Sequence, residues 1–223
     1  MREATPIDAI AEDHTRALVD LVPTLATSLG VPGRDHLVDD LSPAGGRALA
    51  DLNRATLAKL DAATPVDATD EVTVAALRDR LGLAIESFDA GDHLRDLNNI
   101  ASPLQGLRDI FDLMPHETSE HWANIAARMA GLPGAIDGYI ETLRGGIAAH
   151  NTPAIRQVEL AIAESAGLAD AEASFFTTFA EGARPDGDAP TAALAGDLAA
   201  GAAAAREALG RFSEFLRAEL ARV

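Results

Sequence analysis

Two histidines and two glutamates fall within the short stretch PHETSEHW, residues 115–122, and side chains of these types are common zinc ligands. In the metalloprotease signature H-E-x-x-H, histidines four residues apart lie about 40° from each other around a helix, so both can bind one ion. His116 and His121 are five residues apart, which on a helix separates them by about 140°. The reversed signature H-x-x-E-H would need a histidine where the chain has Glu117. We therefore expect no shared metal site at this pair.

A helix start explains the same stretch without a metal. Thr118 is a residue type that caps helices, and Glu120 would lie in the first turn, where the helix dipole favours a negative charge. Apolar residues then follow at helical spacing, from Trp122 to Leu132. On this interpretation His116 lies outside the helix. The other four histidines are isolated in sequence, and we expect them at the surface: His14, His36, His93 and His150.

Motifs for phosphate binding and for nucleophilic catalysis are absent from the sequence. It contains no G-x-G-x-x-G after a strand, no G-x-x-x-x-G-K-[ST] and no G-x-S-x-G. The acidic pairs Asp39-Asp40 and Asp186-x-Asp188 occur among glycines and prolines, where aspartate commonly bonds to the backbone of a turn. Neither pair fits the twelve-residue calcium loop, so we favour turn formation over calcium binding.

One polar stretch, DLNNIASPLQGLRDIFD at residues 96–112, interrupts the helical pattern. Its amides and guanidinium are candidates to line a cleft and bind a ligand carbonyl or carboxylate: Asn98, Asn99, Gln105 and Arg108. The alternative, which we favour, is that the asparagines shape the loop and that Arg108 pairs with a neighbouring acid.

The elements that position these residues are predicted to be helices throughout. Hydrophobic residues make up 48% of the chain but aromatic residues only 4%, which indicates an aliphatic, alanine-rich core of the kind that closely packed helices form. No run alternates apolar and polar residues as a strand does. We predict an all-α, multi-helix bundle of eight or more helices with short connections, forming a single helical domain over residues 1–223.

Individual elements follow from periodicity and turn residues. We expect a first helix over residues 7–29, kinked or divided at Pro23, and then a long turn-rich connection before a helix capped by Asp40 or Ser42. The apolar stripe from Leu132 to Ile147 predicts a helix separate from the Trp122 helix, with Pro133 near its start. A last helix is expected over residues 191–221.

The charge balance excludes several classes of partner. With 18 basic and 35 acidic residues, the net charge is −17, and binding to nucleic acid or to an anionic membrane requires a basic patch. The chain has no cysteine, which excludes disulfides and thiolate metal sites. Its amino terminus lacks the apolar segment of a signal peptide, and no stretch reaches the roughly 20 strongly apolar residues of a membrane span. We expect a cytoplasmic protein.

Two segments also carry a family resemblance. The run NNIASPLQGLRDIFDLMPHETSEHWANIAARMAGLPGAIDGYIETLRGGIAAHNTPAIRQVELAIAE, residues 98–164, resembles the amino-terminal half of a bacterial family, domain of unknown function 885. The segment DLVPTLATSLGVPGRDHLVDDLSP, residues 20–43, is similar to the start of that family. Members of the family resemble gluzincin-type zinc metallopeptidases: they are longer than this chain, predominantly helical, and carry an H-E-x-x-H helix in the carboxy-terminal half.

The resemblance implies a function but transfers no catalytic residue, because this chain has no H-E-x-x-H. It implies a non-catalytic helical half of a zinc metallopeptidase or amide hydrolase that forms one wall of the substrate cleft. Zinc and the general base would belong to a carboxy-terminal half, and the chain alone would be inactive. The alternative is a stand-alone helical module that binds a ligand or a protein.

The two-part hypothesis also predicts an exposed surface where the second half would dock. We expect it at residues 98–108 and at the end of the last helix, where Phe212, Phe215 and Leu216 share one side. Such a surface would be covered either by the catalytic half or by self-association into a homodimer.

Overall fold

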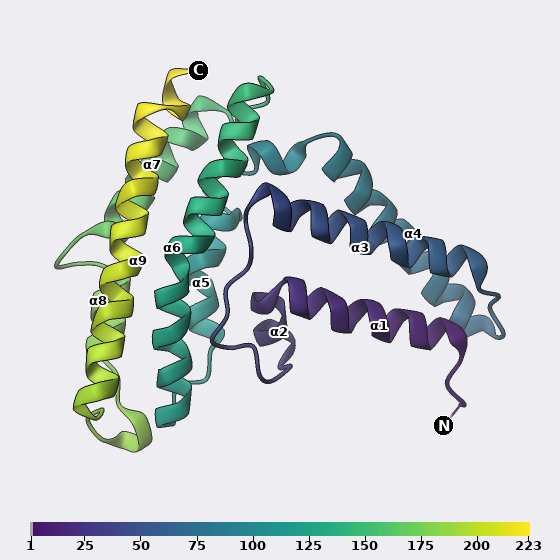
Figure 1. Ribbon diagram of the computed structural model, residues 1–223, viewed down its shortest axis with the longest axis horizontal. Coiled ribbons are helices and arrows are strands. Elements are labelled where there is room, and N and C mark those ends of the chain that lie inside the picture. Colours follow the sequence, from purple (N-terminus) through teal and green to yellow (C-terminus); the bar gives the residue numbers. More distant parts are fainter. Residues whose placement is uncertain (1) are drawn as a thin grey trace.

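The computed structural model describes residues 2–223, and this part of the chain contains nine α-helices, three short 3₁₀ helices and no strand (Figure 1). The α-helices are α1 (Pro6–Leu21), α2 (Pro23–Leu29), α3 (Pro43–Ala62), α4 (Ala68–Asp89), α5 (Pro103–Leu113), α6 (Ser119–Ala148), α7 (Ile155–Ala169), α8 (Phe175–Glu181) and α9 (Ala192–Ala218). The 3₁₀ helices are η1 (Asp92–Arg95), η2 (Pro185–Gly187) and η3 (Leu220–Arg222). The prediction of an all-α protein is confirmed.

Side chains at the helix starts explain why the helices begin where they do. The Ser42 hydroxyl accepts hydrogen bonds from two N–H groups in the first turn of α3, and Pro43 then occupies a position where no N–H is needed. The Thr118 hydroxyl accepts from the N–H of His121 at the start of α6. The caps predicted at Ser42 and Thr118 are confirmed, and His116 lies outside the helix as expected.

The carboxy-terminal bundle, α5 to α9, holds the larger hydrophobic core. Its centre is the pair α6 and α9, which lie side by side and run in the same direction (Figure 1). Near the start of both helices, Gly201 lets α9 approach α6 so closely that a Cβ there would lie 2.7 Å from the carbonyl oxygen of Ala126. Further along, the rings of Tyr139 and Phe212 stack with their centroids 5.2 Å apart.

The amino-terminal layer, α1, α3 and α4, extends to one side of this bundle (Figure 1). It has its own small core of Ile7, Leu60 and Val74. His14 of α1 is also buried, at 7% exposure, and its Nδ1 lies 3.0 Å from the Thr56 hydroxyl on α3. The expectation that all isolated histidines lie at the surface is therefore wrong for His14, since a buried hydroxyl satisfies the polar ring.

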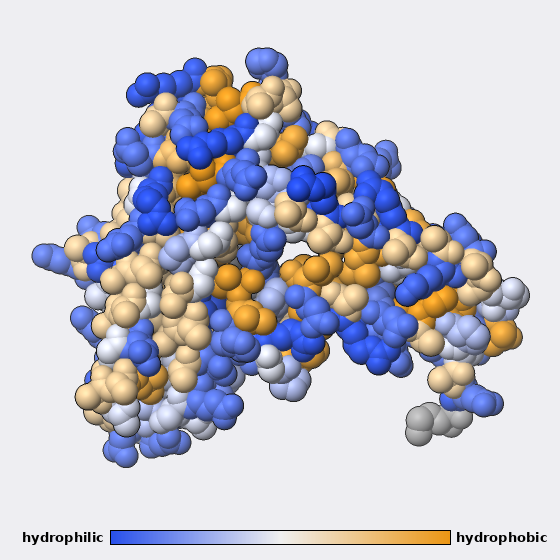
Figure 2. All heavy atoms as spheres, in the orientation of Figure 1, coloured by the Kyte–Doolittle hydropathy of each residue, from blue (hydrophilic) through white to orange (hydrophobic). Residues whose placement is uncertain are grey.

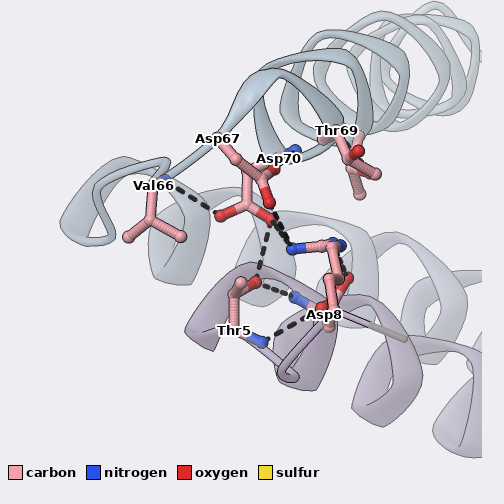
Figure 3. A network of polar contacts seen from close by, with 8 residues as sticks. Thr5, Asp8, Val66, Asp67, Thr69 and Asp70 are labelled. Atoms are coloured by element: carbon pink, nitrogen blue, oxygen red, sulfur yellow. Dashed lines mark hydrogen bonds and ion pairs between the residues drawn. The ribbon is translucent and has the colours of Figure 1, made fainter.

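A polar network fastens the start of the chain to α4 (Figure 3). Arg2 pairs with Asp8, Asp67 and Asp70, and the Thr5 hydroxyl donates a hydrogen bond of 2.8 Å to the fully buried Asp70. Burial acts to raise the pKa of Asp70, but the N–H of Val66, the Thr5 hydroxyl and the Arg2 charge outweigh it and hold the pKa below its ordinary value. Asp70 is therefore kept as a carboxylate that needs all of these partners.

The irregular connection between α2 and α3, residues 30–42, packs across α6 rather than projecting into solvent. The guanidinium of Arg128, which is fully buried, donates hydrogen bonds to the backbone oxygens of Leu37 and Arg34. The Thr142 hydroxyl donates to the Leu41 carbonyl at 2.8 Å. Gly138 permits the contact, because a Cβ there would lie 2.8 Å from the backbone nitrogen of Ser42. The long, turn-rich connection predicted here is confirmed, and α6 holds it in place.

Two predictions about the bundle are wrong. The apolar stripes on either side of Pro133 belong to one continuous 30-residue helix, α6. A proline inside a helix costs about 3 kcal/mol, and burial of α6 against α9 along both halves offsets that cost.

The second error concerns the end of the last helix. Phe212, Phe215 and Leu216 are 1%, 5% and 0% exposed, so they form no docking surface. They pack inside the bundle against α6, and the Arg144 guanidinium of α6 lies 5.3 Å from the centre of the Phe215 ring. The apolar stripe read as an exposed face therefore has its partner within the same chain.

Among the helices formed by residues 2–223, none combines the length and apolar character that crossing a membrane requires.

Candidate functional site: a cleft between the helical layer and the bundle

Two adjoining cavities, of about 450 and 290 Å³, lie where the amino-terminal layer meets the bundle. They share the lining residues Asp39, Leu41, Asp96 and Pro103, so they are neighbours, and we refer to the two together as the cleft. In Figure 2 the surface is hollowed between the bundle and helices α1 and α3. The volumes fall around the lower end of the range of small-molecule sites, roughly 300 to 1,000 Å³.

The walls of this cleft are mostly apolar. The larger cavity is bounded by the connection after α2, by the loop before α5 and by α5 itself. The smaller cavity lies between the end of α1, the start of α3 and α6. Their apolar lining consists of Leu21, Val22, Val38, Leu41, Leu49, Ile100, Pro103, Leu107, Ile110 and Leu132. An apolar ligand body placed here would be removed from water, which favours binding.

Asp39 lines both cavities and Asp40 lines the smaller one. Both carboxylates already accept hydrogen bonds within the protein. Asp39 accepts hydrogen bonds from the N–H of Thr24 at 2.9 Å and from its hydroxyl at 2.5 Å. Asp40 accepts from the N–H of Ser42. The prediction that an aspartate here bonds to the backbone of its own turn is confirmed for Asp40. Asp39 instead ties the turn to Thr24 of α2, 15 residues earlier in the chain.

Asp96 is different, because its carboxylate has no hydrogen-bond or ion-pair partner among residues 2–223. It lies in the loop after η1 and contributes to both cavities. The side chain keeps access to water, yet the protein around the cleft desolvates it enough to raise its pKa above the ordinary value. The backbone is fixed nearby, because the Tyr139 hydroxyl donates a hydrogen bond to the Asp96 carbonyl.

His93 and Tyr139 supply the remaining titratable groups of the smaller cavity. The His93 ring stacks on Phe88 with centroids 4.4 Å apart, and its Nδ1 is buried without a partner in the described chain. Burial lowers the pKa of His93, so the imidazole is neutral near pH 7. Burial also raises the pKa of Tyr139, which therefore stays protonated.

The four residues proposed from the sequence do not gather in the cleft. The Asn98 side chain accepts hydrogen bonds from the N–H groups of the next turn, and the Asn99 N–H donates to Gln157. The Arg108 guanidinium pairs with Asp112 and lies 4.3 Å from the centre of the Phe175 ring. These contacts match the alternative in which the asparagines shape the loop and the arginine pairs with an acid.

Gln105 is the one of the four that lines the larger cavity. Its side-chain oxygen accepts from the Ser102 N–H in a capping box, and its amide nitrogen donates to Glu164 at 2.6 Å. Sequence reasoning missed Asp96, His93 and Tyr139 because only the fold places them around one cavity. The signal available in sequence was weak: Asp96 opens the polar stretch at residues 96–112.

Of the two histidines near the start of α6, His121 takes part in the helix cap and His116 does not. The His121 Nδ1 lies 3.3 Å from the backbone nitrogen of Thr118 and 3.0 Å from a Glu117 oxygen. The His116 Nδ1 lies 3.3 Å from the carbonyl oxygen of Met114. Within residues 2–223 no three or more histidine, cysteine or acidic side chains gather in an arrangement that fits a metal ion. We therefore derive no chemical step through zinc on these residues.

Comparison with known proteins identifies the family. No curated protein matches the chain. A family model described as "Bacterial protein of unknown function (DUF885)" matches residues 23–223. The matched range includes the connection across α6, the whole bundle and every residue of the cleft except Leu21 and Val22. The chain therefore belongs to the DUF885 family of bacterial proteins.

Proposed function

We propose that this chain is a non-catalytic helical part of an amide-hydrolysing DUF885 protein and that its cleft forms one wall of the substrate site. The observation that carries the proposal is the pair of adjoining cavities, with their apolar walls and a free carboxylate at Asp96. A site of this form binds and orients a ligand, because apolar area supplies affinity and a few polar groups fix the position.

In this proposal the chain binds the substrate, and another segment carries out the hydrolysis. A zinc ion with a bound water and a carboxylate base is the arrangement that H-E-x-x-H helices supply. The described residues offer no such donor set. The partner in this proposal is therefore a catalytic segment that carries the motif and places it against the cleft.

A second candidate is a stand-alone helical module that binds a ligand without any reaction. The burial of Phe215 favours it, because the apolar end of α9 is satisfied within the chain and needs no second half to cover it. Both candidates use the same cleft, and they differ in whether a catalytic segment exists.

The reading frame that follows Val223 in the gene distinguishes the two. A frame that encodes H-E-x-x-H supports the substrate-wall proposal, whereas a stop codon supports the stand-alone module. If the motif is present, the longer protein should hydrolyse peptide amides in the presence of zinc.

A blocking substitution then tests whether this cleft takes part. Gly106 lines the larger cavity, and a Cβ there meets nothing within 4 Å, so Gly106→Trp should occupy the cavity without displacing the backbone. Gly134→Trp is the matched control, because position 134 is equally open and lies outside the cleft. Loss of hydrolysis in the first variant alone supports the proposal, and full activity in both refutes it.

A further inference from the structure

The charge of the cleft is strongly one-sided. Four carboxylates line the two cavities: Asp39, Asp40, Asp96 and Asp109. The part of the chain that the structure describes contributes no lysine or arginine to either lining, and the one imidazole is His93, whose pKa burial lowers. The lining therefore carries an excess of negative charge, which is partly offset by Arg108 beside Asp109 and by the buried Arg128 near Asp39.

Among these carboxylates, Asp96 is the one left without a partner. Asp39 bonds to Thr24, Asp40 bonds to the N–H of Ser42, and Asp109 lies 3.2 Å from the Arg108 guanidinium. Asp96 has no such contact among residues 2–223, although the surrounding protein desolvates it. Its side chain is exposed to water, so a ligand cation can reach it, and pairing with that cation would offset the partial desolvation.

The position of Asp96 sets the shape of such a ligand. It lies where the two cavities meet, with apolar walls on both sides. The backbone of the loop is held by the Tyr139 hydroxyl, so the carboxylate is presented from a fixed position. A cationic head at this point would place an attached apolar group against the side chains of α5 or of α3.

We propose that the cleft binds small molecules or peptide ends with a primary ammonium group, which pairs with the Asp96 carboxylate while an apolar side chain lies against the cleft walls. An α-ammonium is favoured because it is a compact charge joined directly to the carbon that carries the side chain, so the head can reach Asp96 while the side chain stays against the apolar walls. This inference deepens the proposed function and rests on the same cleft, since it names the amino end of the substrate as the part that this wall recognises.

The test compares two probes that differ only in the ammonium group: leucyl-leucine amide and its N-acetyl derivative. Binding is measured by nuclear magnetic resonance titration of the chain at about pH 6.5, where an α-amino group is protonated. We expect the free amine to shift resonances of residues 38–46 and 93–107. The acetylated probe should bind about ten-fold more weakly or worse, because a charge-assisted hydrogen bond is lost.

Variants assign that difference to one carboxylate. Asp96→Asn keeps the shape of the side chain and should bring the affinity for the free amine down to that for the acetylated probe. Asp79→Asn on α4 is the matched control, because Asp79 is exposed and outside both cavities, and the change in net charge is the same. The control should bind as wild type does. Since the two probes are also compared on the wild type, the test does not depend on the folding of any variant.

The outcomes separate this inference from the proposed function. If both probes bind in the cleft with equal affinity and Asp96→Asn changes nothing, the ammonium inference is overturned while the ligand-binding cleft stands. If neither probe shifts the cleft resonances, both proposals are overturned.

Discussion

Replacement of Arg128 by methionine should destabilise the protein by about 2 to 4 kcal/mol. The guanidinium is fully buried in α6 and donates three hydrogen bonds, to the Leu37 carbonyl at 2.7 Å, the Thr27 hydroxyl at 2.9 Å and the Arg34 carbonyl at 3.1 Å. Methionine fills a similar volume, so the loss is mainly polar.

The magnitude follows from two opposing effects. A hydrogen bond to a charged group contributes about 1.5 to 3 kcal/mol net. Three such bonds from one side chain are not independent, and the burial that lowers the pKa of Arg128 also makes the charged form costly. The guanidinium nitrogen Nη1 is buried and has no partner in the described chain, so part of that cost is uncompensated. We therefore expect less than the sum of three bonds.

Urea unfolding followed by far-ultraviolet circular dichroism measures this effect. Arg80→Met is the control, because Arg80 is exposed on α4, and surface substitutions change stability by about 0.5 kcal/mol or less. An Arg128→Met protein as stable as wild type would refute the reasoning. The free-energy cost of burying the charge would then equal the stabilisation by its hydrogen bonds. The same variant should also weaken ligand binding, since Arg128 holds the connection that carries Asp39 and Leu41 into the cleft wall.

Two further predictions concern packing and pH. Gly146→Ala should lower stability by about 1 to 3 kcal/mol, because the added Cβ would lie 2.4 Å from the Leu94 carbonyl oxygen. Gly134→Ala should raise stability by about 0.5 to 1 kcal/mol, because a Cβ there would meet nothing within 4 Å. Thermal unfolding of both variants checks this, and equal shifts would show that α6 and η1 do not approach so closely. Asp70 has a lowered pKa, so its stabilisation is fully present above the unfolded-state pKa and is lost as pH falls through the lower folded-state value. The wild type should therefore lose more stability than Asp70→Asn between about pH 5 and pH 2, and equal acid slopes in denaturant titrations would contradict this.

Much of the helical structure could be predicted from local sequence. A capping residue acts within the first turn of its helix, so Ser42 and Thr118 could be identified as caps from the local sequence. The interruption at Pro23 separates α1 from α2 for the same reason, because a proline removes a backbone donor. These features require no knowledge of what packs against the helix.

The remaining features depend on contacts between distant segments. Pro133 does not end α6, because α9 buries the helix on both sides of it. Phe215 resembles an exposed terminal apolar residue until α6 is placed beside it. Arg128 lies in an alanine-rich run and gives no local sign that it reaches a carbonyl 91 residues away. Asp96 is an ordinary loop aspartate in sequence, and its lack of a partner is a property of the cleft.

Hydrogen–deuterium exchange with and without leucyl-leucine amide tests the central claim, that the junction of the helical layer and the bundle is the ligand site. At saturating ligand we predict slower exchange in peptides that cover residues 38–46 and 93–107, which contain the four residues that line both cavities. Peptides from the groove between α8 and α9, residues 177–206, serve as the internal comparison. Protection confined to that groove, or no protection at residues 38–46 and 93–107, would contradict the assignment of function to this cleft.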